Sequence, residues 1–352
     1  MQLVSILYYA LILYSIVYGC FHSQEPIGFD KGNIKSVKGI LACTVVASHL
    51  PGYVTHFLPG ISFAVFGASS VGVFYLLSGY GVYYSLQNQK NYFSHFIRKR
   101  FVKILVPFVI MVVLYITLDM AVNHTSFRFY VDLLLMGYPV SNSWYVFACL
   151  LCYVCFRFSF GKKNRSFCKS IILLVSLVAV YIFLVACVLH WASWWYITVM
   201  MFPVGILIAR FRNRVSGFLV KYKWPVLTAA LLASVAAYFS SAFMRRVCSV
   251  SLEVRYLINE ILMAWTFAAL IVTVFSNCSV KNRISQFLGG ISFEIYLYHG
   301  LSMTLLKPIV FGIVENPVYA EELFSMLVVL LTIAAAYIMH KVNDKVIRLI
   351  LR

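Results

Sequence analysis

The sequence predicts an all-α polytopic membrane protein, and its composition and its long apolar stretches both support that fold class. Hydrophobic residues fill 62% of the 352 positions, whereas charged residues fill only 11%. Soluble domains are about one quarter charged, so this composition excludes a water-soluble globular protein. A helix needs about 20 apolar residues to cross the hydrocarbon core of a bilayer, and stretches of that length recur along the whole chain.

About eleven such stretches follow one another, and each is expected to form one transmembrane helix. The first has no basic residue ahead of it and no small-residue cleavage site, which favours a retained helix over a signal peptide. We therefore expect one domain over residues 1–352, in which an added N-terminal helix (1–21) precedes a ten-helix core (37–340). The spans are expected at 3–21, 37–57, 64–86, 104–122, 143–158, 170–190, 194–209, 224–242, 256–275, 284–306 and 323–340.

The loop charges predict the orientation of these spans. The formal net charge is +18, and the basic residues crowd into alternate loops near 90–103, 157–169 and 210–223. Cytoplasmic loops collect Lys and Arg, so we expect a multi-pass membrane protein with its N-terminus outside and its C-terminus in the cytoplasm. Because the cations fall in these loops, they do not indicate a nucleic-acid partner.

The nine cysteines lie almost wholly inside apolar stretches, which is typical of small buried apolar residues rather than of disulfides. Cys149, Cys152 and Cys155 form a stripe with three-residue spacing. No His or fourth Cys completes a ligand set there, so packing is favoured over metal binding or redox work, and no metal site is expected.

Ionisable residues inside a span are costly, so each is a candidate functional residue. His49 follows Lys38 by eleven positions, which in a helix places it roughly 16 Å from the cytoplasmic end. His299 lies at similar depth on a late span, five positions after Glu294. The structural alternative is that each His is a satisfied packing residue, and that Glu294 and Glu260 pair with cations of neighbouring helices.

Three further features admit a structural and a functional interpretation. Ser78 and Gly79 belong to a small-residue stretch that either packs helices closely or forms a groove for a ligand. The basic segment 98–103 either anchors to lipid headgroups or binds a phosphorylated donor. The tryptophans Trp144, Trp191, Trp194 and Trp195 form either an aromatic belt or a surface on which sugar rings stack.

Four stretches together resemble the acyltransferase-3 family of integral membrane acyltransferases, many of which O-acylate surface carbohydrates. Residues 37–42 (VKGILA), followed by His49, are similar to the family's Arg-Gly-Ile opening and its His. The order and the spread of the four stretches carry the resemblance, because each is short and apolar. The other three are residues 67–80, which contain VGVFYLLSGY, residues 96–107 (FIRKRFVKILVP) and residues 291–299 (ISFEIYLYH).

The chain departs from the family pattern at three positions. Lys38 and Lys103 stand where the family has Arg, and a Lys keeps the charge but loses the bidentate fork. Cys149 stands where many members carry a Glu, so the carbohydrate acetyltransferases with that Glu are not the nearest pattern. The sequence shows no soluble esterase-like domain, so a completing step would need another protein, such as a glycan-assembly protein.

The resemblance implies O-acyl transfer, with cytosolic acyl-CoA as co-substrate, acetyl as the expected group moved, and no bound cofactor. His49 is expected to be the base or the transient acyl acceptor, while His299 and Glu294 orient it or line the acceptor path. The donor phosphates are assigned to Lys38, Arg98, Arg100 and Lys103. A carbohydrate or glycolipid acceptor is expected to enter from the outer side or from membrane lipid, near Ser78, Gly79 and Trp144.

Two other functions remain open from the sequence. Many spans, intramembrane ionisable groups and outward aromatics also suit a polysaccharide or glycolipid transporter or flippase, although no internal repeat is visible. A non-enzymatic scaffold of a glycan-assembly complex is the third possibility. Replacing His49 separates the enzyme from both, because an enzyme variant would lose acyl decoration while keeping the polymer itself.

Overall fold

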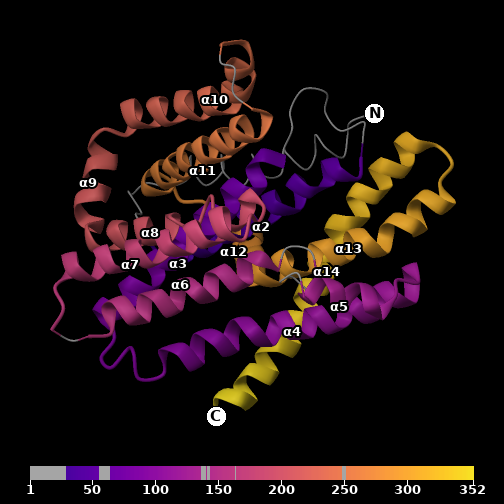
Figure 1. Ribbon diagram of the computed structural model, residues 1–352, viewed down its shortest axis with the longest axis horizontal. Helices are drawn as coiled ribbons and strands as arrows, with labels where there is room; N and C mark the ends of the chain where they lie inside the picture. The colour runs from indigo at the N-terminus through magenta and orange to yellow at the C-terminus, as the bar shows by residue number, and fades with distance from the viewer. Residues whose placement is uncertain (1–28, 55–63, 136–139, 141–142, 163, 248–250) are drawn as a thin grey trace.

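The computed structural model describes residues 29–54, 64–135, 140, 143–162, 164–247 and 251–352 as an all-helical bundle (Figure 1). No β-strand occurs among these residues. The expected N-terminal helix at 3–21 lies outside them. The α-helices are α2 (Lys31–His49), α3 (Ala64–Asn88), α4 (Phe96–Asn123), α5 (Phe127–Leu135), α6 (Trp144–Phe160), α7 (Phe167–Phe183), α8 (Met201–Arg210), α9 (Arg212–Lys221), α10 (Lys223–Val247), α11 (Leu252–Asn277), α12 (Arg283–Gly290), α13 (Ser292–Ile313) and α14 (Pro317–Leu351).

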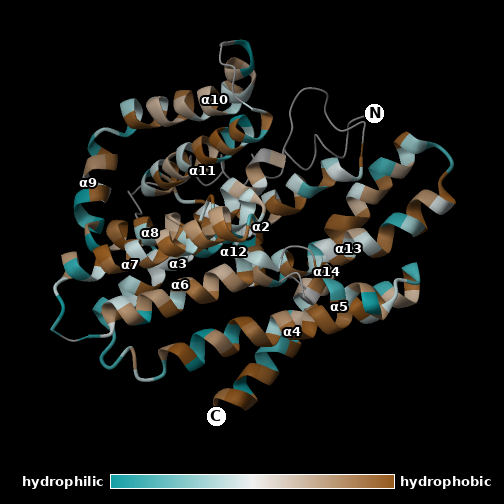
Figure 2. Ribbon diagram, viewed as in Figure 1, coloured by the Kyte–Doolittle hydropathy of each residue, from teal (hydrophilic) through white to brown (hydrophobic). Residues whose placement is uncertain are grey.

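Long apolar helices confirm the predicted fold class. Within the described residues, five helical stretches are long and apolar enough to cross a bilayer: Phe96–Asn123, Phe167–Val188, Lys223–Arg246, Leu252–Asn277 and Pro317–Leu351. Brown, hydrophobic residues recur along these helices in Figure 2. The protein is thus an all-α polytopic membrane protein, and the full number of about eleven spans stays a prediction.

Local sequence signals explain where several of these helices begin. Ser166 and Ser251 accept backbone N–H groups at the starts of α7 and α11, and Asn316 does so at α14, where Pro317 occupies the first helical position. Such side chains satisfy N–H groups that have no partner inside the helix, and Pro loses no bond at that position.

Glycines bring the central helices into close contact. A methyl group at Gly79 of α3 would collide with the Phe202 carbonyl of α8, and one at Gly205 of α8 would collide with the Leu76 carbonyl of α3. The contact is therefore reciprocal, and backbone meets backbone. Gly289 packs in the same way against the Lys35 carbonyl, which joins α12 to α2. Small residues at helix crossings permit this approach inside a membrane.

Several helix boundaries differ from those expected. The stretch 284–306 is two helices, because Ile291 leaves helical geometry between α12 and α13. The helix expected from 194 begins only at Met201, after a short 3₁₀ turn over Ser193–Trp195. Pro107 lies inside α4, where it costs one hydrogen bond without ending the helix. The hydropathy of the sequence does not predict these helix boundaries.

Basic loops converge at one end of the bundle, here called the basic end. Arg157 lies over the Phe93 ring at 5.0 Å, and Arg210 lies over the Phe167 ring at 5.4 Å. These contacts join the α3–α4 loop, the α6–α7 loop and the α8–α9 junction, which Figure 1 shows together at the left of the bundle. The convergence agrees with the alternate-loop pattern of charge.

Candidate functional site

The two predicted histidines form a pair. His49 is the last residue of α2 and His299 lies on α13, and their ring centroids are 5.0 Å apart at an interplanar angle of 33°. His299 is completely buried, whereas His49 is exposed. The histidine that a substrate can touch is therefore His49, and His299 supports it from behind.

The His299 ring is oriented by the backbone of its own helix. Its Nδ1 lies 2.6 Å from the carbonyl oxygen of Tyr296. A carbonyl can only accept a hydrogen bond, so Nδ1 is the donor and carries a proton. Fixing one ring nitrogen in this way sets the tautomer and the orientation of an imidazole.

His49 opens into a cavity of about 750 Å³, here called the histidine cavity. The four tryptophans that were expected near the acceptor all line it, with Trp191 and Trp195 in ring contact at 4.5 Å. Glu260 also lines this cavity and accepts a hydrogen bond of 2.8 Å from the Ser193 hydroxyl. The cavity thus combines flat apolar faces, one carboxylate and one exposed imidazole.

A second, smaller cavity of about 160 Å³ lies deeper among the helices and is here called the lysine cavity. Lys38, Ser78 and Cys149 line it together with Tyr145, Tyr153 and Tyr296. The Arg100 guanidinium lies 5.4 Å from the Tyr153 ring centroid and donates to the Tyr92 hydroxyl at 3.1 Å. Lys38 and Arg100 are near enough to interact electrostatically, so two of the four predicted donor-binding cations lie together here.

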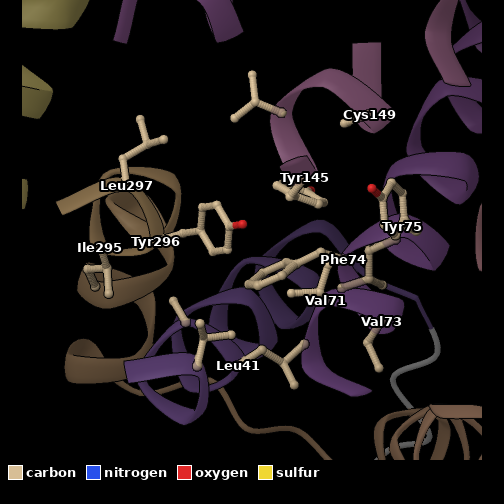
Figure 3. Close-up of a cluster of buried hydrophobic side chains, with 14 of the residues drawn as sticks. Leu41, Val71, Val73, Phe74, Tyr75, Tyr145, Cys149, Ile295, Tyr296 and Leu297 are labelled. Atoms are coloured by element: carbon tan, nitrogen blue, oxygen red, sulfur yellow. The ribbon is translucent and has the colours of Figure 1, made fainter. Parts of the chain in front are cut away.

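Tyr296 lines both cavities and contacts Tyr145, which lines the lysine cavity, and these two residues are here called the tyrosine partition. Their ring centroids are 5.0 Å apart in an edge-on arrangement. Figure 3 shows the Tyr296 ring directed from α13 towards Tyr145 of α6, next to Cys149. Tyr296 also contacts the His299 ring at 5.9 Å, so the partition adjoins the histidine pair.

Two predicted site residues have other roles in the structure. Glu294 is buried and accepts hydrogen bonds from Nδ1 of His340 (3.0 Å) and from Nδ2 of Asn343 (3.3 Å), which tie α13 to α14. Its bonding matches the structural alternative of a carboxylate that joins neighbouring helices. Gly79 faces the Phe202 backbone, so its substrate-binding assignment is replaced by close helix packing, while Ser78 beside it does line a cavity.

The other two predicted donor-binding cations lie apart from Lys38 and Arg100. Arg98 donates a 2.7 Å hydrogen bond to the carbonyl of Ile350 near the end of α14. Lys103 is exposed and is not among the residues lining the lysine cavity. Successive residues of α4 point in different directions, so a basic cluster in the sequence is dispersed around the helix.

Sequence reasoning missed the tyrosines of α6. Tyr145, Cys149 and Tyr153 are spaced four residues apart, which places them on one helical face, and that face lines the lysine cavity. The spacing was available as a signal. Among the described residues, no group of His, Cys, Asp and Glu is arranged to hold a metal ion. Cys149, Cys152 and Cys155 are all buried, and Cys149 lines the lysine cavity.

One comparison with known proteins has a positive result. A family model described as an acyltransferase domain, of the acyltransferase-3 type, matches residues 31–341. The match covers the two histidines, the tryptophans and both cavities. Neither a curated protein nor a solved structure matches the chain.

Proposed function

The chain belongs to the acyltransferase-3 family, and from that premise we propose that it transfers a short acyl group, acetyl, from cytosolic acyl-CoA to a hydroxyl of a cell-surface or lipid-linked carbohydrate. That it is a membrane acyltransferase follows from the family and from the fold. The donor, the acceptor and the acyl group are the proposed part. The family match favours acyl transfer over the transport alternative.

The histidine pair at the wall of the tryptophan-lined cavity carries the proposal. Acyl transfer to a hydroxyl needs a base within reach of the acceptor. His49 is exposed in a cavity large enough for a sugar, and buried His299 holds a defined tautomer 5.0 Å behind it. Such an exposed and oriented imidazole is what general-base catalysis requires.

In the proposed reaction, His49 removes the proton from the acceptor hydroxyl as its oxygen attacks the thioester carbonyl carbon. The new C–O bond forms, the C–S bond breaks, and the thiolate of coenzyme A leaves and takes up the proton from His49. His299 is a positioning residue, because it is completely buried and contacts His49 rather than the cavity. A general base contributes about 10²- to 10⁴-fold to the rate of such a step.

The two cavities suit the two substrates. Lys38 and Arg100 supply positive charge beside the small lysine cavity, which fits a short acyl group on an anionic donor. The tryptophan faces and the Glu260–Ser193 pair supply apolar and hydrogen-bonding surfaces for a sugar. Movement of the Tyr296 ring would connect the cavities, so that the thioester reaches His49.

The proposed setting is the inner (cytoplasmic) cell membrane, with the basic end in the cytoplasm and the histidine cavity towards the outside. Cations collect in cytoplasmic loops, and acyl-CoA is cytosolic, so both arguments place the donor at the basic end. Glycan-assembly proteins are the proposed partners for any step that follows acyl transfer.

The test compares surface glycans by mass spectrometry, before and after mild base, from cells with the intact protein, without it, and with His49→Ala. We expect a base-labile acetyl-sized mass to be lost in the null and His49→Ala cells, with the glycan itself present. His124→Asn is the matched control, because His124 is exposed at the end of α4 in left-handed geometry that Asn tolerates.

Two results would contradict the proposal. If folded His49→Ala protein acylated as well as the intact protein, His49 would not be the base. If the null cells lacked the whole polymer but kept normal acylation of residual glycan, transport would replace acyl transfer.

A further inference from the structure

Three arginines line a third cavity, here called the arginine cavity, which neither the histidine pair nor the lysine cavity includes. It has a volume of about 490 Å³ and lies between the last residues of α3 and the α8–α9 junction. Side-chain amides complete its polar wall. Its polar lining residues are Gln87, Asn88, Arg210, Arg212, Asn213 and Arg214.

No carboxylate neutralises these guanidinium groups within the described part of the chain. The ion pairs there involve Lys281 with Asp30, and His340 with Glu294 and Asp344. Two of the arginines are instead held by aromatic rings, Arg210 over Phe167 at 5.4 Å and Arg212 over Tyr84 at 5.1 Å. Stacking restrains a guanidinium while leaving its N–H groups available in the ring plane.

The backbone adds positive potential at the same place. Helix α9 begins at Arg212, its N-cap residue Phe211 makes no side-chain capping bond, and its first turn holds no acidic residue. The first N–H groups of a helix lack partners within it, and the helix dipole favours an anion there. Phe211 and the first residues of α9 line the arginine cavity, so these N–H groups lie at its wall.

We propose that the arginine cavity is a binding site for a ligand that carries phosphate groups. Three forked guanidinium groups, three side-chain amides and an uncapped helix N-terminus all donate hydrogen bonds, and no carboxylate lines the cavity. Multiply charged, acceptor-rich phosphates match this donor set better than a single carboxylate does.

The position on α3 indicates one source of the phosphate. Gly67 lines the histidine cavity, Ser78 lines the lysine cavity, and Gln87 lines the arginine cavity, so the three cavities follow one another along a single helix. At 1.5 Å per residue, Ser78 and Gln87 are roughly 14 Å apart along the axis. Nine residues are also about two and a half turns, so a donor with its phosphates in the arginine cavity would need a flexible arm that passes around α3 to bring its thioester to the lysine cavity. This source rests on the proposed function.

The position of α9 indicates a second possible phosphate-bearing ligand for the arginine cavity, a membrane lipid. Figure 1 shows α9 crossing the left end of the bundle, transverse to α7 and α8. Phe218 and Tyr222 on or next to α9 are exposed, as is Trp224 at the start of α10. A helix with exposed apolar and basic groups at a membrane surface contacts lipid headgroups, which also carry phosphate.

The experiment measures binding rather than turnover, so its failure is distinct from failure of acyl transfer. The full-length protein is placed in nanodiscs of phosphatidylcholine, and coenzyme A is titrated by calorimetry. In parallel, retention of added phosphatidylglycerol is measured by native mass spectrometry. The variants are Arg214→Gln, whose residue is exposed and makes no stacking contact in the described structure, and the double variant Arg212→Gln, Arg214→Gln.

We expect Arg214→Gln to weaken binding of the phosphate ligand about tenfold and the double variant about a hundredfold, because hydrogen bonds to charged groups are the strong ones. Arg214→Lys should lie between, since it keeps the charge but loses the fork. The control is Lys162→Gln, Lys169→Gln, which removes two exposed charges from the α6–α7 loop and the first turn of α7 at the same end, outside the cavity. It should change binding by less than about twofold.

Each outcome has a defined meaning. Weakened coenzyme A binding assigns the cavity to the donor, and weakened phosphatidylglycerol retention assigns it to lipid. If both ligands bind the arginine variants as they bind the lysine control, the cavity is not a phosphate site. Thermal unfolding of each variant in the same nanodiscs confirms that loss of binding is not loss of fold.

Discussion

The helices that carry the site differ from the helices that face outwards. In the apolar stretches Phe167–Val188 and Lys223–Arg246, which include α7 and most of α10, only 17% and 11% of the apolar segment is buried. Helices α2, α3 and α13, which carry the histidines and much of the cavity lining, are not among the five stretches identified by length and hydropathy. The long apolar stretches α7 and α10 are thus mostly exposed, whereas the two histidines lie on helices packed at the centre of the bundle.

The physical reason is that the two groups have different surroundings. Lipid tails give no reason for helices to associate, so central helices are held by close backbone packing and by hydrogen bonds between helices. These contacts need Gly, Ser, Asn and His, which lower hydropathy. The outward helices need only an apolar surface, as the brown surfaces of α4 and α7 show in Figure 2.

The largest expected effect is on stability, when a larger side chain is placed where the central helices α3 and α8 cross. Gly205→Leu places a side chain against the Leu76 carbonyl and should lower the free energy of unfolding by about 3 kcal/mol. Gly312→Leu is the matched control, because nothing lies within 4 Å of a methyl group there. Unfolding in detergent micelles measures both. Equal stability of the two variants would show that the α3–α8 contact is not tight.

A somewhat smaller effect is expected from the buried member of the histidine pair. His299→Gln should lower kcat about a hundredfold, because His49 loses its oriented neighbour, while KM for the acceptor stays unchanged. Steady-state acyl transfer measures both constants, with His124→Asn as the control. A rise in KM without a fall in kcat would mean that His299 shapes the cavity rather than positioning His49.

A tenfold difference in the KM for the carbohydrate is expected between variants of two exposed tryptophans. Trp194, which is 50% exposed, lines the histidine cavity, and Trp224, which is 68% exposed, lies at the start of α10. Trp194→Ala should raise KM for the carbohydrate about tenfold through lost ring contacts, and Trp224→Ala should leave it unchanged. If both variants behave alike, Trp194 belongs to an interfacial belt and not to the acceptor site.

The smallest effect is expected at the start of α2. The Lys281 ammonium beside Asp30 lowers the pKa of that carboxyl below its ordinary value of 3.8, and both side chains are partly exposed. The folded-state pKa is depressed, so this contribution to stability is present above about pH 3.8 and is lost as the pH falls through the folded pKa. It amounts to less than about 1 kcal/mol, because solvent screens the pair.

Asp30→Asn keeps the capping oxygen for Asn33 and removes the charge. Melting curves recorded between neutral pH and pH 3 should therefore differ between the two proteins at neutral pH and converge at low pH. A constant difference at every pH would assign the effect to the cap instead of the ion pair.

The position of a residue along its helix could be predicted from the sequence, but the neighbouring helix that its side chain faces could not. His49 and His299 were expected at similar depth, and the structure places their rings in contact. Trp144 and the Trp191–Trp195 group were expected to gather, and they line one cavity. Both expectations depend only on distance from a helix end, which residue counting supplies.

The partners of charged residues depend on which distant helix lies opposite. Arg98 bonds to Ile350, which is 252 positions away, and Glu294 bonds to His340 and Asn343. Local sequence patterns do not indicate which distant residues these side chains will contact. The same limit explains why Arg210, Arg212 and Arg214 were interpreted only as a topology signal, since the cavity they line needs Gln87 and Asn88 from another helix.

The tyrosine partition also bears on how the membrane stores energy. An enzyme with water-filled spaces reaching in from both surfaces would short-circuit the ion gradients of its cell if those spaces met. The Tyr145 and Tyr296 rings are 5.0 Å apart, and Tyr296 lines both cavities. A ring pair that keeps the two cavities apart would also act as electrical insulation, and that requirement would limit how widely and how long any passage between them could open.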